Sequence, residues 1–114
     1  MNKIFVFGSN LAGRHGAGSA LEAKNNWGAE YGVGIGRTGN SYAIPTKDEK
    51  LNVLPIIEIV DYIEGFKHYA RLHPELEFSV VKIGCGLAGY SEDVMKQFFR
   101  DAPENCTLPE GWRE

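Results

Sequence analysis

Glycine is distributed unevenly along this chain of 114 residues, and its placement constrains the fold more than any other feature. Nine of the fourteen glycines fall within the first forty residues, and three more cluster at Gly84, Gly86 and Gly89. Glycine-rich segments beside apolar strands mark places where the backbone turns sharply or closely approaches another group. Two such segments, 8–18 and 83–90, follow apolar runs and lead into helical patterns, so we expect two strand–loop–helix units.

The elements around these segments alternate between strand and helix. Strands are predicted over 3–7, 41–45 and 78–83, with a short final strand at 107–108. Helices are predicted over 17–31, from about 54 to 73, and from 92 to about 101, with Pro55 in the first turn of the second and Ser91 capping the third. The inward face of the first helix should consist of Ala17, Ala20, Leu21 and Trp27. This order predicts an α/β fold, a three-layer α/β/α arrangement with a mixed, mainly parallel sheet.

Length and composition narrow the class of partner. The chain has room for a single domain over residues 1–114, and its net charge of −3, without a cluster of Lys and Arg, argues against binding to a nucleic-acid backbone. Two cysteines, Cys85 and Cys106, are too few for a disulfide framework. The first apolar run is too short for a signal peptide, and no run is long enough to span a membrane, so we expect a cytoplasmic protein. No metal-ligand spacing is present, and no metal or cofactor is expected.

The two glycine-rich segments are expected to lie at the same edge of the sheet, because ligand sites of open α/β sheets lie outside the carboxyl ends of parallel strands. Each offers backbone N–H groups at a helix start, and a diphosphate bridging the two loops would contact both sets. The alternative is that these glycines only make tight turns between strand and helix. For one such loop alone we favour this alternative, but two loops at the same edge favour a ligand site. Residues 34–39 match a dinucleotide-binding pattern literally, but a short strand rather than a helix follows them, so we reject that match.

Four side chains are suited to catalysis or ligand contact. His15 lies inside the first loop, where it is expected to be solvated or to contact a phosphate or ribose. Cys85 stands between two glycines, where we expect a small buried residue more than a reactive thiolate. Lys47 follows the second strand and can reach a phosphate or an ester carbonyl, or lie at the surface. Asp93 follows Glu92 at the start of the third helix, where the helix dipole alone favours acids.

Several of these segments together resemble the macro domain family, in the branch that contains terminal ADP-ribose protein glycohydrolase. They are Asn10 after the first strand, the segment 15–18 that opens a helix, the segment 83–89, and the strand that ends in Thr46-Lys47. The resemblance implies a macro-domain fold in which two loops hold the diphosphate and distal ribose of ADP-ribose. The residues implied to contact the ligand are Ser9, Asn10, His15, Gly16, Ala17, Gly18, Gly84, Cys85, Gly86, Leu87, Ala88, Gly89 and Tyr90.

The hydrolytic branch of this family also implies catalytic residues. Lys47 matches the lysine that attacks the ribose in that branch, and we take Asp93 as the acid that assists it. Ala88 stands where the branch has an aspartate, and the chain begins after the strand whose aspartate recognises adenine in macro domains. The short length suggests a minimal version such as a phage genome carries.

The sequence therefore favours the binding of ADP-ribose or a related diphosphate-containing nucleotide, with or without hydrolysis of an ADP-ribosyl linkage. Two alternatives stay open. One is a non-catalytic module that sequesters the nucleotide, and the other is a protein-interaction domain whose glycines are structural.

Overall fold

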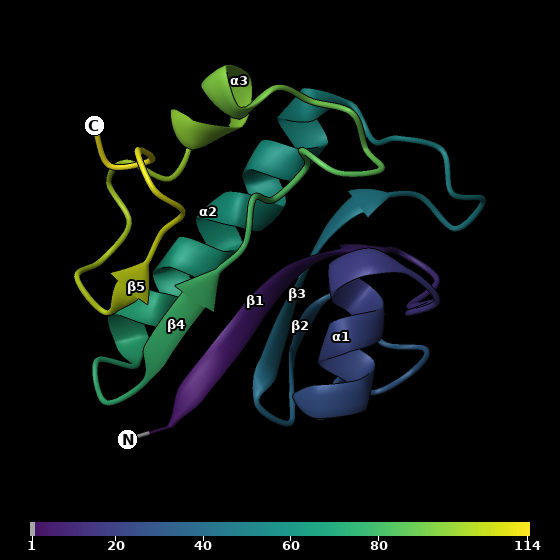
Figure 1. The fold of residues 1–114 in the computed structure, drawn as a ribbon, viewed down its shortest axis with the longest axis horizontal. Helices are drawn as coiled ribbons and strands as arrows, with labels where there is room; N and C mark the ends of the chain where they lie inside the picture. Colours follow the sequence, from purple (N-terminus) through teal and green to yellow (C-terminus); the bar gives the residue numbers. More distant parts are fainter. Residues whose placement is uncertain (1) are drawn as a thin grey trace.

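The central strand of the sheet is β1 (Lys3–Asn10), which lies between β3 (Ser41–Lys47) and β4 (Glu77–Val80) (Figure 1). The structure is a computed structural model that describes residues 2–114, and its five-stranded sheet has the order β2-β3-β1-β4-β5. β1 pairs in parallel with both of its neighbours, and β5 (Cys106–Thr107) pairs in parallel with β4. β2 (Gly36–Thr38) runs antiparallel to β3. The mixed, mainly parallel sheet predicted from the sequence is confirmed.

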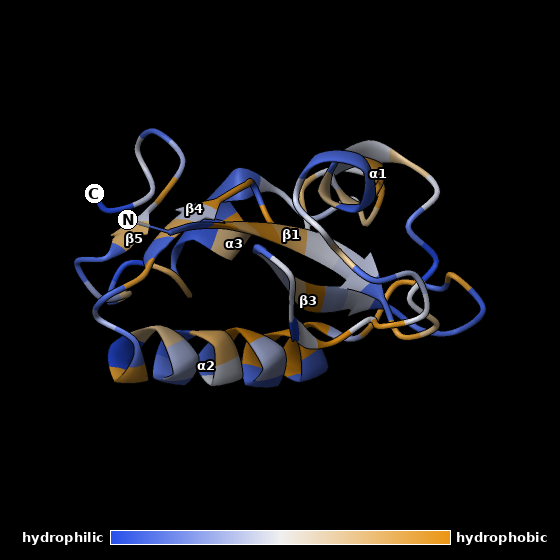
Figure 2. Ribbon diagram, turned by 90° about the horizontal axis from the view of Figure 1, so that it is seen from below, coloured by the Kyte–Doolittle hydropathy of each residue, from blue (hydrophilic) through white to orange (hydrophobic). Residues whose placement is uncertain are grey.

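Helices cover both faces of this sheet. α1 (Gly18–Asn26) lies on one face, and the long α2 (Ile56–Leu72) lies on the other, as Figure 2 shows. A short helix, α3 (Glu92–Lys96), follows the loop after β4. The arrangement is the predicted three-layer α/β/α fold.

Alternating side chains of β1 enter two different core clusters. Ile4 and Val6 belong to the larger cluster, which contains the buried apolar residues of α2, whereas Phe5 and Phe7 belong to a smaller cluster beneath α1. A central parallel strand is buried on both faces, and this explains its continuous apolar sequence. Beneath α1 the ring of Phe5 stacks on that of Trp27, with ring centroids 5.3 Å apart.

The C-terminal segment completes the larger core cluster. Trp112 is 1% exposed and packs on Phe99, with ring centroids 5.5 Å apart. The guanidinium of Arg113 donates hydrogen bonds to the carbonyl oxygens of Ala102, Pro103 and Cys106 at 2.7–2.9 Å. The end of the chain is therefore held in place by a buried ring and by a cation on backbone carbonyls.

Several element ends differ from the predictions. α1 ends at Asn26 rather than at residue 31, because Gly28 follows with a φ of +76°, and Ala17 and Leu21 are exposed rather than inward. Pro55 occupies the N-cap position of α2, one residue before the helix. Residues 36–38, expected within a loop, form β2.

The later elements are also shorter or shifted. β4 ends at Val80 instead of 83, and β5 begins one residue earlier than predicted. Ser91 caps α3 as predicted, since its Oγ accepts a hydrogen bond from Val94 N at 3.2 Å, but the helix ends at Lys96. Beyond it, the N–H groups of Phe98, Phe99 and Ala102 donate to carbonyl oxygens three residues earlier. The Phe98 carbonyl accepts a bond of 2.8 Å from the buried Lys67 ammonium. Within residues 2–114, no helix combines the length and the apolar character needed to cross a membrane.

Candidate functional site

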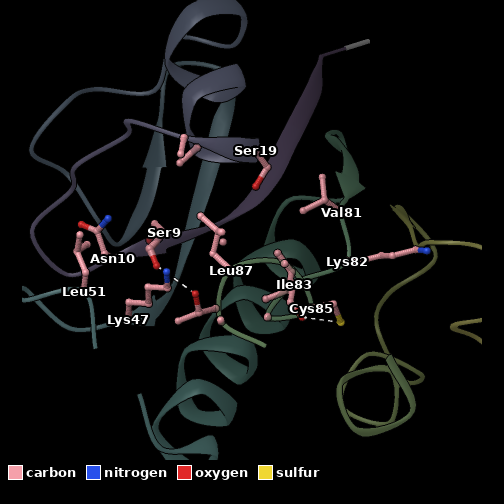
Figure 3. A pocket seen from close by; sticks show the side chains of 18 of the residues that line it. Ser9, Asn10, Ser19, Lys47, Leu51, Val81, Lys82, Ile83, Cys85 and Leu87 are labelled. Carbon is pink, nitrogen blue, oxygen red and sulfur yellow. Dashed lines mark hydrogen bonds between the residues drawn. The ribbon is translucent and has the colours of Figure 1, made fainter. Parts of the chain in front are cut away.

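A cleft of about 940 Å³ opens at the carboxyl edge of β1, between the loop that leads to α1 and the loop that follows β4 (Figure 3). Pockets for small ligands are commonly of this size. Its lining consists of Gly8, Ser9, Asn10, Arg14, Gly16, Ala17, Gly18, Ser19, Ala20, Tyr31, Thr46, Lys47, Leu51, Val81, Lys82, Ile83, Gly84, Cys85, Gly86, Leu87, Ala88 and Glu92.

We call residues 8–18 the first wall; it ends in an uncapped helix start. Ala17 is the N-cap residue of α1 and offers no side-chain acceptor to the N–H groups of the first turn. A Cβ atom built on Gly16 or Gly18 would meet nothing within 4 Å, so both glycines leave the backbone open to the cleft. Unpaired N–H groups at a helix start, together with the helix dipole, form a favourable place for an anion.

Hydrogen bonds and close backbone contacts hold the first wall rigidly. The side-chain amide of Asn10 donates to the Arg14 carbonyl and accepts from the Arg14 N–H, both at 2.9 Å. The Ser9 hydroxyl donates to the Gly34 carbonyl. A Cβ atom on Gly34 would come within 2.1 Å of the Asn10 carbonyl oxygen, and one on Gly13 would meet the backbone of Gly32 at 2.3 Å. These glycines allow backbone to pack directly on backbone.

We call residues 84–88 the second wall. It has fewer contacts with the rest of the protein than the first wall has. Gly84 has a φ of +79° and packs on Met95, while a Cβ atom on Gly86 would meet nothing within 4 Å. Leu87 is 76% exposed. The N–H groups of Gly86, Leu87 and Ala88 donate no hydrogen bond to another described residue, so they too are available to a ligand.

The charged side chains of the lining favour an anion. Arg14 and Lys47 take part in no ion pair within residues 2–114. The one acidic residue of the lining, Glu92, accepts bonds from the Trp112 indole N–H at 3.1 Å and from the Lys82 ammonium at 3.0 Å. These two bonds hold the pKa of Glu92 below its ordinary value. A chain of net charge −3 thus presents three cations and one engaged carboxylate at this cleft.

Cys85 is half-buried, and its thiol lies 3.6 Å from the Ile83 carbonyl oxygen. Burial and the nearby Glu92 raise the pKa of this thiol, against a smaller opposing effect of Lys82. A raised pKa disfavours the thiolate at neutral pH, so Cys85 lacks the environment of a nucleophile. Cys85 was expected to be a small buried residue, and the structure leaves it only half-buried.

The expectation that His15 is solvated was wrong. Its side chain is 1% exposed, and its Nε2 lies 3.2 Å and 3.1 Å from the carbonyl oxygens of Glu30 and Val33. The ring also makes edge contacts with Phe7 and Tyr31, and it does not line the cleft. His15 therefore fastens the first wall to the segment after α1.

Three other predicted site residues lie away from the cleft. Asp93 has a side chain that is 91% exposed and pairs with Lys96 at 3.4 Å, so the structure does not bring it to Lys47. Gly89 and Tyr90 do not line the cleft either, and the Tyr90 hydroxyl donates to the Leu54 carbonyl at 2.8 Å. The predicted residues that do line it are Ser9, Asn10, Gly16, Ala17, Gly18, Lys47, Gly84, Cys85, Gly86, Leu87 and Ala88.

Sequence reasoning missed several lining residues. Arg14 lies inside the first glycine-rich segment, so its position beside an expected anion site could have been predicted from the sequence. Tyr31 and Leu51 lie in segments without any motif, and only the folded chain brings them to the cleft. Among residues 2–114, no group of three or more His, Cys, Asp and Glu side chains is placed to hold a metal ion.

Two solved structures from Bacteroides thetaiotaomicron resemble this fold. One, described as a protein of unknown function, is 17% identical with a TM-score of 0.65, over 93% of this chain and 85% of that chain. The other, an X-ray crystal structure, is 18% identical with a TM-score of 0.63, over 94% of this chain and 88% of that chain. Identities this low show the fold alone. No protein-family model and no curated protein matches the chain.

Proposed function

We propose that the cleft binds ADP-ribose or a related diphosphate-containing nucleotide, with the diphosphate between the first and second walls. The observation that carries the proposal is that unpaired backbone N–H groups of two separate loops open onto one cleft. Backbone N–H groups arranged in this way bind phosphate without a cluster of basic side chains, which agrees with the acidic composition.

The lining residues at the two ends of the cleft indicate which end of the ligand lies where. Lys47 and Asn10 lie together at one end of the cleft, whereas Ser19 and Val81 lie at the other (Figure 3). In the macro domains that the sequence resembles, the residues matching Asn10 and Lys47 contact the distal ribose. We therefore assign the sugar of the nucleotide to the Lys47 end.

Binding without hydrolysis is the second candidate, and the acidic residues favour it. General acid–base catalysis needs a carboxyl or similar group within hydrogen-bond reach of the reacting atoms. Glu92 is engaged by Lys82 and Trp112, Asp93 lies outside the cleft, and position 88 is an alanine. Within the described residues Lys47 thus has no acidic partner in the lining, and a module that holds the nucleotide fits this arrangement better than a hydrolase.

The test is titration calorimetry with ADP-ribose, cyclic ADP-ribose, NAD and AMP, followed by analysis of the same samples for new products. Saturable binding that requires the diphosphate supports the proposal, and a new product makes the protein a hydrolase. If none of the four ligands gives heat above the buffer signal, the nucleotide proposal is wrong, and structural glycines in a protein-interaction domain become the better account.

Lys47→Ala separates the two candidates. We expect ADP-ribose to bind about ten- to a hundredfold more weakly, because a charged hydrogen bond to the ligand is lost. A hydrolase would also lose turnover, whereas a sequestering module has none to lose. Lys50→Ala is the matched control, since Lys50 is exposed in the adjacent turn and does not line the cleft. An equal affinity of Lys47→Ala and wild type would contradict the assignment of the sugar end.

A further inference from the structure

A tight turn after β3 carries an exposed leucine to the cleft. Asp48 closes this turn: its N–H donates to the Asn52 carbonyl at 2.8 Å, and its Oδ1 accepts from the N–H groups of Lys50 and Asn52 at 2.9 Å each. Lys47 also pairs with Val53 in an isolated antiparallel bridge. The turn is therefore fixed relative to β3 by its own backbone bonds.

Leu51 has an unfavourable backbone conformation in this turn. Its φ is +67°, and within residues 2–114 it is the only residue other than glycine with a positive φ. In this region the Cβ atom of an L-residue crowds its own backbone, and only glycine, asparagine and aspartate adopt it routinely. Asn52, the next residue, would tolerate the conformation better, yet the leucine occupies it.

Packing in the fold does not offset this strain. Leu51 is 47% exposed and is not among the side chains that pack on either core cluster. An exposed leucine in a left-handed conformation thus carries a conformational cost and a solvation cost at once. Residues held in such conformations concentrate at ligand clamps and active sites.

The position of Leu51 shows where a compensating contact lies. Leu51 lines the cleft beside Asn10, at the end where Lys47 also lies (Figure 3). We infer that Leu51 covers the terminal sugar of the bound nucleotide, packing on the apolar face of the ring and keeping water away from the Lys47 end. This inference rests on the proposed function. It narrows the ligand class to nucleoside diphosphates that carry a terminal sugar.

Leu51→Gly tests the inference, because glycine removes the side chain and relieves the strain together. We expect it to weaken ADP-ribose binding about tenfold, the effect of losing a partly buried leucine side chain. Binding of ADP, which lacks the terminal sugar, should change less than twofold. The thermal midpoint of the ligand-free protein should rise. Leu51→Met, which keeps an apolar chain, should stay near wild-type affinity.

Ile57→Ala is the matched control, because Ile57 is a 71% exposed apolar side chain outside the lining. It should leave both affinities unchanged. An unchanged ADP-ribose affinity in Leu51→Gly, or equal losses for ADP and ADP-ribose, would overturn the inference and leave the proposed function standing. A lower thermal midpoint would also overturn it, by showing that the leucine supports the fold. Failure of the wild type to bind either ligand would overturn the proposed function itself.

Discussion

The two walls of the cleft are both rich in glycine, but their glycines serve different physical purposes. Gly13 of the first wall, and Gly34 that packs against this wall, lie where backbone packs on backbone and no Cβ atom fits. In the second wall, Gly86 faces open space and nothing in the protein requires a glycine there. Gly13 is thus required by the fold, whereas Gly86, like Gly16 of the first wall, leaves the backbone open to what approaches from outside.

This difference shows that two glycine-rich loops in the same site can differ in how firmly the rest of the protein holds them. The first wall is braced by the Asn10 amide, the Ser9 hydroxyl and the buried His15 ring. The second has turn hydrogen bonds, the contact of Gly84 with Met95 and that of the Cys85 thiol with the Ile83 carbonyl oxygen. A ligand would meet one preformed wall and one with fewer internal restraints.

Gly34→Ala should have the largest effect. The new Cβ atom would lie 2.1 Å from the Asn10 carbonyl oxygen, so the two backbone segments must separate. We expect a loss of about 3 kcal/mol or more in the free energy of unfolding, in the range of severe overpacking. Urea denaturation followed by circular dichroism measures it. A stability near that of the wild type would show that the first wall is not built by close backbone packing.

Gly86→Ala should weaken ligand binding but leave the stability of the protein almost unchanged. Its Cβ atom meets nothing within the protein, so the free energy of unfolding should change by less than about 0.5 kcal/mol. ADP-ribose should bind about tenfold more weakly, since a methyl group would stand between the ligand and the N–H groups of the second wall. Calorimetry under the conditions used for the wild type gives the comparison. Unchanged affinity would mean that the second wall does not approach the ligand.

The alkylation of Cys85 should give the smallest effect. Its pKa is raised by burial first and by Glu92, so iodoacetamide at pH 8 should modify it more slowly than an unstructured cysteine. Saturating ADP-ribose should slow the reaction a further few-fold by covering the second wall. Mass spectrometry follows both cysteines, with Cys106 as the internal reference, because burial raises its pKa to about 11. If ADP-ribose does not change the alkylation rate of Cys85, this residue does not belong to the binding surface.

The layout of the fold was predictable because its signals are local. A continuous apolar run identifies β1 and helical spacing identifies α2, and the parallel order brings the two glycine-rich segments to one edge. The site was predictable to the extent that it consists of these segments. The burial of His15 depends on carbonyl groups fifteen and eighteen residues away, which no local pattern reveals. The conformation of Leu51 depends on the Asp48 turn, and a leucine carries no signal for it.

Boundaries of elements were predicted less well for a related reason. α3 ends at Lys96, just before Phe98, whose carbonyl accepts a hydrogen bond from the buried ammonium of Lys67 in α2, 31 residues away in the sequence. β2 has only three residues and exists because it pairs with β3 across a tight turn. Such contacts form between segments that are distant in the sequence, so local propensity does not predict them.

The burial of Trp112 has a consequence for the order in which the chain folds during synthesis. The central strand leaves the ribosome more than a hundred residues before the ring that completes the larger core cluster. Until then the space beside Phe99 is unfilled, and Glu92 at the cleft lacks its indole partner. We therefore expect the nascent chain to complete the larger core cluster and the hydrogen bonding of Glu92 in the same late step.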